Sequence, residues 1–224
     1  HGISIRAEEL FRIGGWPVTN AVLLSALAVV LLAALAFLIR RKLAIVPGHL
    51  QSVFELFLEE LLKIMDAVLG NRERSERYLP LVATIFLFIL TANWLGLLPF
   101  AGLGLHAPAG EHGEEAFIPL LRAPASDLNF TIALALISVA SANIIGIAAV
   151  GFPAHARKFF TLKSPIAAFT GVLELISEFV RIISFSFRLF GNVFAGEVLL
   201  AIIGFLTPYL LPLPFLFLEV LVGF

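Results

Sequence analysis

The chain has 224 residues, of which 60% are hydrophobic and 14% charged, and its formal net charge is -1. A soluble domain has roughly 45–50% apolar residues, so this composition indicates an integral membrane protein. The absence of cysteine excludes disulfides, iron–sulfur clusters and thiolate chemistry. We therefore expect a lipid bilayer as the environment and no nucleic-acid partner.

The first two predicted segments are residues 1–17 and 18–39. Residues 1–17 carry charged side chains in a short amphipathic pattern that ends near Trp16, which predicts a segment at the outer interface. Residues 18–39 have no ionisable side chain and match the roughly 20 residues that a spanning helix needs. A cleaved signal peptide fits less well, because basic residues 40–42 follow directly where small residues would be expected.

Residues 48–69 have apolar side chains at intervals of three and four residues, with acidic and basic ones largely on the other face. This pattern favours an amphipathic helix on the inner membrane surface over a spanning one. The polar residues 70–77 predict a connector, and residues 78–100 predict a second span.

The rest of the chain predicts an outer loop and further helices. Residues 101–127 are rich in Gly, Ala and Pro and predict an extramembrane loop, in which metal binding by His106 and His112 has little support from ligand spacing. The remaining predicted segments are a span at 128–152, a long tilted or bent helix at 165–206, and a truncated last span at 208–224. The sequence thus predicts an all-α membrane protein with about five spanning helices in a single membrane domain, 1–224.

Most Lys and Arg residues lie in 40–78 and 153–163. Positive charge is enriched on the inner side of membranes, so we expect the amino terminus outside. The chain begins at His1, its one methionine is Met65, and residue 224 lies in an apolar run, so we expect residues to be missing at both ends.

A polar row runs along the predicted helix 165–206. Successive helical residues turn by about 100°, so positions seven apart lie almost in line. Glu174, Arg181 and Arg188 form such a row, with Ser184 beside it and Asn192 one turn beyond Arg188. Glu197 is nine positions after Arg188 and falls on roughly the opposite side of the helix. The arginine therefore lies between two separate polar routes.

Several pairings are open for these charges. Arg181 can pair with Glu174 or Glu178, whereas Arg188 has no acid three or four positions away. Glu219 on the last span is one candidate partner for Arg188. Alternatively, Glu197 and Glu219 form a buried carboxyl pair in which one of them holds a proton, because adjacent negative charges repel each other.

An arginine in such a place is a poor proton carrier, since its guanidinium stays protonated. It is a good electrostatic barrier, because it repels a proton and attracts a carboxylate that has just lost one. The glutamates are the plausible proton carriers.

The ten residues from Arg188 to Glu197, Arg-Leu-Phe-Gly-Asn-Val-Phe-Ala-Gly-Glu, resemble the signature of subunit a of the F-type ATP synthase membrane sector. The resemblance extends over essentially the whole chain. It includes Thr91–Pro99, Ser126–Thr131 and Leu213–Pro214.

The resemblance implies a proton-translocating stator subunit with two half-channels against a c-subunit ring. It implies that Arg188 separates the channels, that Asn192 lies near the arginine, and that Glu197 and Glu219 belong to the outer channel. Glu174 and Ser184 would then belong to the inner one. It also implies peripheral-stalk b subunits as partners, no cofactor, and ATP synthesis and hydrogen ion transport in a bacterial plasma (inner) membrane. A glutamine of the family's last helix would lie beyond residue 224.

The rival interpretation is a self-contained ion-coupled transporter or channel. That class favours inverted repeats and broken helices in both halves, and the sequence has neither. An enzyme is not expected, because there is no glycine-rich phosphate loop, no nucleophile with a nearby base and no metal motif.

Overall fold

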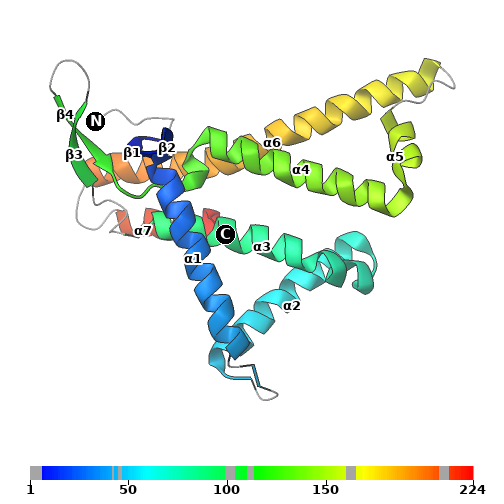
Figure 1. Cartoon of the computed structure of the whole chain (residues 1–224), viewed down its shortest axis with the longest axis horizontal. Helices are drawn as coiled ribbons and strands as arrows, with labels where there is room; N and C mark the ends of the chain where they lie inside the picture. The colour runs from blue at the N-terminus through cyan, green and yellow to red at the C-terminus, as the bar shows by residue number, and fades with distance from the viewer. Residues whose placement is uncertain are drawn as a thin grey trace. The chain divides into compact units, whose positions relative to one another are not determined.

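The computed structural model of the chain consists mainly of α-helices (Figure 1). The residues form two compact units, mainly Glu9–Ala123 and mainly Pro124–Val222, called here the amino-terminal and carboxyl-terminal units. The structure describes residues 7–41, 43–44, 47–98, 104–109, 114–159, 165–206 and 212–223.

The amino-terminal unit begins with an antiparallel hairpin of β1 (Glu9–Ile13) and β2 (Trp16–Thr19). Gly14 and Gly15 make its turn with φ of 58° and 89°, which side chains disfavour and glycine accepts. The sequence predicted an interfacial segment here but not the strands. Helix α1 (Asn20–Arg41) follows, and the buried Asn20 Nδ2 donates to the carbonyl oxygen of Pro119 at 3.2 Å.

Helices α2 (His49–Leu69) and α3 (Arg72–Gly96) meet at a tight turn. Gly70 ends α2 in a left-handed conformation with φ of 66°, and its N–H donates to the carbonyl of Asp66. The Asn71 side chain caps α3 by accepting from the N–H of Glu73 at 2.9 Å. The prediction of a connector over 70–77 was therefore wrong from Arg72 onwards, because this cap starts the helix six residues before the apolar run.

The apolar face of α2 packs against α3. Leu61, Met65 and Ala83 form a buried cluster, and the rings of Phe57 and Phe86 lie 5.5 Å apart. This packing accounts for the three- and four-residue apolar spacing of α2. Its place on the inner membrane surface stays a prediction.

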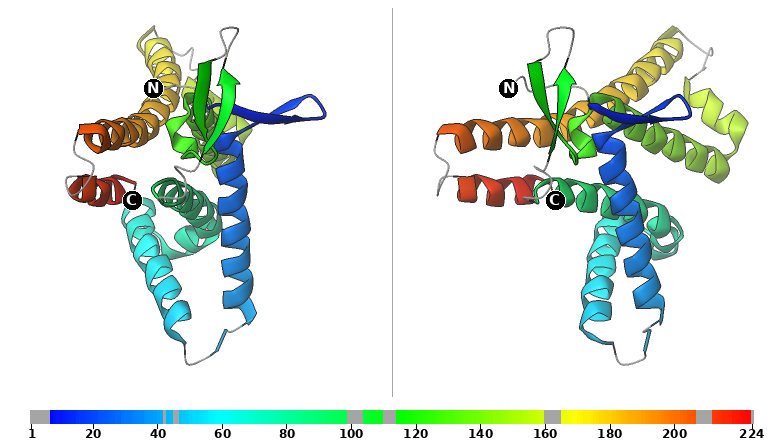
Figure 2. Two further views of the ribbon diagram at one scale, coloured as in Figure 1. Left: turned by 90° about the vertical axis from the view of Figure 1, so that its left-hand side faces the viewer. Right: turned by 60° about the vertical axis from the view of Figure 1, so that its left-hand side comes forward.

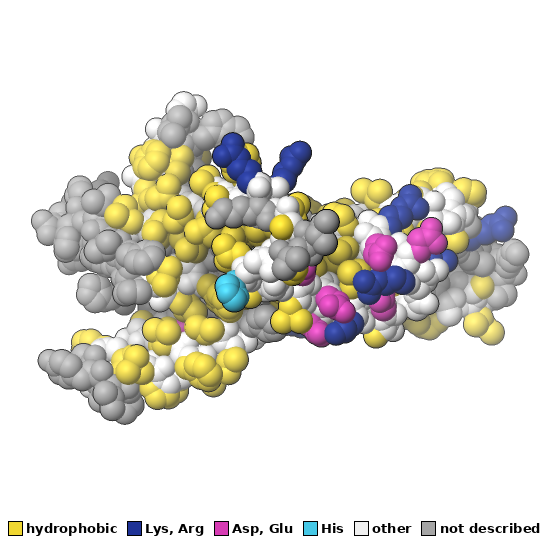
Figure 3. All heavy atoms as spheres, turned by 90° about the horizontal axis from the view of Figure 1, so that it is seen from below, with side chains coloured by type: hydrophobic (Ala, Val, Ile, Leu, Met, Phe, Trp, Pro, Cys, Tyr) yellow, Lys and Arg dark blue, Asp and Glu magenta, His cyan; other side chains and the backbone are white. Residues whose placement is uncertain are grey.

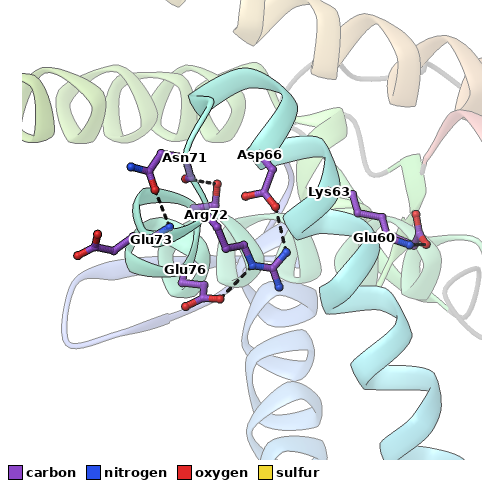
Figure 4. Close-up of polar contacts among 8 residues, drawn as sticks. Glu60, Lys63, Asp66, Asn71, Arg72, Glu73 and Glu76 are labelled. Atoms are coloured by element: carbon purple, nitrogen blue, oxygen red, sulfur yellow. Dashed lines mark hydrogen bonds and ion pairs between the residues drawn. The ribbon is translucent and has the colours of Figure 1, made fainter.

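A charged network closes the turn between α2 and α3 (Figure 4). Arg72 donates to Asp66 Oδ2 at 3.0 Å and to Glu76 Oε1 at 2.9 Å. The Ser75 hydroxyl and the Arg72 guanidinium hold the pKa of Asp66 below its usual range. A lowered carboxyl pKa stabilises the folded state above the usual Asp value and stops doing so as the pH falls through the lowered value.

We expect Asp66→Asn to speed amide hydrogen exchange at the α2–α3 turn at pH 7, since the variant lacks the charged acceptor. The difference from the unmodified protein should fade below about pH 4, where the carboxyl of the unfolded chain is itself protonated. Glu59→Gln on the same helix is the control and should change exchange little. Equal exchange of the Asp66→Asn and unmodified proteins at pH 7 would contradict the stabilising role.

A second hairpin lies within the predicted outer loop 101–127. It pairs β3 (Gly104–Ala109) with β4 (Glu114–Pro119) in antiparallel register, so the loop has regular structure that its composition did not reveal. The side chain of His106 and the whole of His112 lie outside the described part. The described residues contain no cluster of three or more metal-ligating side chains.

The carboxyl-terminal unit is built on two long helices that run alongside each other (Figures 1 and 2). The buried hydroxyls of Thr131 and Ser186 lie 3.1 Å apart where these helices pack. Figure 2 shows that the longest helix is bent, one of the two forms expected for its length. The elements of this unit are the 3-10 turn η2 (Pro124–Ser126), α4 (Leu128–Val150), α5 (Phe152–Phe159), α6 (Pro165–Leu206) and α7 (Pro212–Val222).

Among the described residues, four helices are long and apolar enough to cross a membrane, namely α1, α3, α4 and α6. Helix α7 is apolar but only 11 residues long. Large apolar side chains such as Phe179 and Phe205 are 64% and 90% exposed, and hydrophobic side chains cover much of the face in Figure 3. Such a surface suits lipid or partner helices rather than water. The predicted class, an all-α integral membrane protein, is confirmed.

Candidate functional site

The polar row predicted on the long helix lies on α6. Arg181, Ser184, Arg188 and Asn192 are exposed, whereas Glu174 and Glu197 are partly buried. All six belong to the carboxyl-terminal unit. On a helix that is apolar enough to cross a membrane, a charged guanidinium is costly unless it has a partner.

Arg188 has a distinctive environment. Its Cζ lies 5.8 Å from the ring centroid of Phe185, and it makes no salt bridge or side-chain hydrogen bond with any described residue. In particular, the possible pairing of Arg188 with Glu219 does not occur in the described structure. The guanidinium of Arg188 is therefore exposed and has no ionic partner among the described residues.

Arg181 takes one of its two predicted partners. Its Nη1 donates to both carboxylate oxygens of Glu178, at 3.2 and 3.3 Å. Glu174 instead pairs with Lys158 of α5. The charges at the amino-terminal end of the row are therefore matched by nearby charged side chains, in contrast to Arg188.

Glu219 on α7 is buried, with only 7% of its surface exposed. Its carboxylate lies against Gly196 of α6, and its Oε2 has no hydrogen-bond partner in the described part of the chain. Glu197 lies near enough on α6 for its charge to act on Glu219. A proton shared by such a pair would reduce the repulsion between two buried negative charges.

A groove of about 240 Å³ lies between α6 and α7, where the two helices run side by side (Figure 1). It brings together Asn192 and Glu219, which are far apart in the sequence. Its wall is mostly apolar, and Asn192 and Glu219 are the polar side chains that line it. The residues around it include Asn192, Gly196, Leu199, Phe215, Leu218 and Glu219.

The family model described as ATP synthase A chain matches residues 22–224. The chain belongs to this family. It is 36% identical over 221 residues to the ATP synthase subunit a of Moorella thermoacetica, covering 98% of this chain and 88% of that protein. It is 39% identical over 193 residues to the ATP synthase subunit a of Gloeobacter violaceus, covering 86% and 71%.

Membership of the ATP synthase A chain family confirms the family predicted from the signature Arg188–Glu197. The chain is accordingly a non-catalytic, integral membrane subunit of a complex that couples proton transport to ATP synthesis. It is not an enzyme by itself.

One residue of this ATP synthase A chain contacts the polar row of α6 although the sequence did not predict such a contact. Lys158 belongs to the basic range 153–163, which was used only to predict orientation, yet it lies on α5 and contacts two acids of α6. The eight-residue helix α5 is little more than two turns long, too short for a helical period to stand out in the sequence.

Proposed function

We propose that this chain is the stator subunit of a rotary F-type ATP synthase, with two proton half-channels that open against a ring of c subunits. Arg188 separates the half-channels. Peripheral-stalk b subunits hold the chain against rotation. The amino terminus faces outward from a bacterial plasma membrane, in keeping with the basic residues of 40–78 and 153–163.

The observation that carries this proposal is the exposed guanidinium of Arg188, which makes no ion pair with any described residue. Holding a charge on an apolar membrane helix is costly unless a partner is provided. A ring carboxylate that arrives, loses its proton and moves on would be such a partner. The arginine would attract each carboxylate and repel protons moving directly between the two routes.

The outer route is supported by the groove between α6 and α7. Asn192 and Glu219 face it, and Glu197 lies close to Glu219. A buried carboxylate with an unsatisfied oxygen can take up a proton that enters from outside. That proton would pass to a ring carboxylate near Asn192.

The inner route is assigned to the opposite stretch of α6. Glu174 and Ser184 lie on the amino-terminal side of Arg188, on the face that also carries Arg181. Glu174 is partly buried and can carry a proton, and the exposed Ser184 hydroxyl can relay one because it both donates and accepts hydrogen bonds. A proton leaving the ring would pass these groups toward the inner surface.

The test is reconstitution of the purified chain in lipid vesicles with and without the c ring. We expect the chain alone to give no proton flux above that of empty vesicles, because half of each proton path belongs to the ring. Adding the ring should create a flux that depends on Arg188. Substantial ion uptake by the chain alone would favour the self-contained transporter instead.

A further inference from the structure

Helix α5 ties the ends of α4 and α6 together (Figure 1). On the α4 side, His155 Nε2 lies 3.0 Å from Asn143 Oδ1, and a Cβ built on Gly146 would come within 3.0 Å of the His155 ring. On the α6 side, a Cβ built on Gly171 would collide with the carbonyl oxygen of Phe159. The two glycines thus let α5 lie close to both long helices, which restricts its position.

Lys158 is the charged side chain through which α5 reaches the polar row of α6. Its Nζ contacts Glu174 Oε1 and lies 3.8 Å from Glu178 Oε1. Glu178 is also held by Arg181 Nη1 at 3.2 Å. Two carboxylates of α6 are therefore held by one cation from another helix and one from their own.

The cation from α5 offsets a local repulsion. Glu174 and Glu178 are four positions apart on one helix, and like charges at this spacing repel each other. Their side chains are 32% and 14% exposed, so water screens the repulsion only in part. An ammonium group that contacts both carboxylates turns them toward α5 and limits the rotamers that they can adopt.

We propose that Lys158 is a positioning residue of the inner proton route. Through its contacts with Glu174 and Glu178 it holds both carboxylates at the inner end of α6, and α5 forms one wall of the proton exit. This inference rests on the role proposed above for Glu174. Proton transfer requires donor and acceptor within hydrogen-bond reach, so the orientation of Glu174 limits the rate at which protons leave.

The test measures ATP-driven proton pumping by the assembled complex in vesicles, together with the amount of complex that assembles. We expect Lys158→Gln to lower the pumping rate about fivefold, the size of effect that follows from losing one partly buried ion pair. Lys158→Arg keeps the charge and should pump within about twofold of the unmodified complex. Lys63→Gln is the matched control, since it removes the same charge from an exposed pair with Glu60 and should leave pumping unchanged.

The double variant Lys158→Gln with Glu174→Gln separates positioning from a general effect on folding. It should pump no more slowly than Glu174→Gln alone, because the lysine acts through that carboxylate. If Lys158→Gln prevents assembly, Glu178→Gln removes the charge that Lys158 and Arg181 both contact, and it should also slow pumping.

Normal pumping by Lys158→Gln overturns the inference. If Lys158→Gln does not assemble, normal pumping by an assembled Glu178→Gln complex overturns it instead. A double variant slower than Glu174→Gln by the full effect of Lys158→Gln overturns it too, since that result shows independent action. Normal pumping by Glu174→Gln removes both the inference and the inner role of Glu174. The stator function itself is tested separately at Arg188.

Discussion

Replacing Arg188 with alanine is expected to abolish coupled ATP synthesis in the assembled complex and to leave the membrane leaky when the ring is present. Alanine provides neither a barrier to protons nor a partner for a ring carboxylate. The loss of one preorganised charged group at a reacting centre costs on the order of a hundredfold or more, so synthesis should fall below detection. The measurements are ATP synthesis under an imposed proton gradient and passive proton flux after the catalytic sector is removed.

Two further variants sharpen this result. Arg188→Lys should restore little synthesis, because lysine lacks the planar fork of the guanidinium and loses its proton more readily in an apolar site. Arg12→Ala removes an exposed arginine that pairs with Glu9 at 2.9 Å on β1 and should leave synthesis unchanged. Undiminished synthesis by the Arg188→Ala complex would refute the proposed function.

The second large effect is expected at Gly196. A Cβ added there would lie 2.8 Å from both Cδ and Oε1 of Glu219, closer than real Cβ contacts come. Gly196→Ala must therefore push the buried carboxylate out of its place or move α7 away from α6. We expect proton uptake through the outer route to fall about tenfold or more, since displacing a transfer group by about 1 Å can cost a hundredfold.

Gly204→Ala on the same helix is the matched control, because a Cβ at Gly204 meets no atom within 4 Å. Replacing glycine by alanine inside a helix favours the helix by about 1 kcal/mol, so this variant should assemble at least as well as the unmodified chain. Proton-gradient-driven ATP synthesis at several gradient strengths reports the uptake rate for both variants. Equal rates for Gly196→Ala and Gly204→Ala would show that the position of Glu219 does not limit uptake.

Much of the helical structure was predictable because it is encoded locally. Apolar runs of spanning length predicted α1, α4 and α6, and three- and four-residue spacing predicted the amphipathic α2. The strands β1 to β4 were not predicted, because a strand is stabilised by pairing with another segment rather than by its own period. The start of α3 was misplaced because a single capping side chain, Asn71, outweighed the polar composition that follows it.

The features of the candidate site also divide into those encoded locally and those that depend on long-range packing. The sequence alone determined the membrane class, the family signature, and the row of Glu174, Arg181 and Arg188, since helical periodicity decides which residues share a face. Only the tertiary structure decided that Arg181 pairs with Glu178, that Lys158 holds Glu174, and that Glu219 lies against Gly196. These last contacts join α5 and α7 to α6, and long-range packing selects such partners from several that the local pattern allows equally.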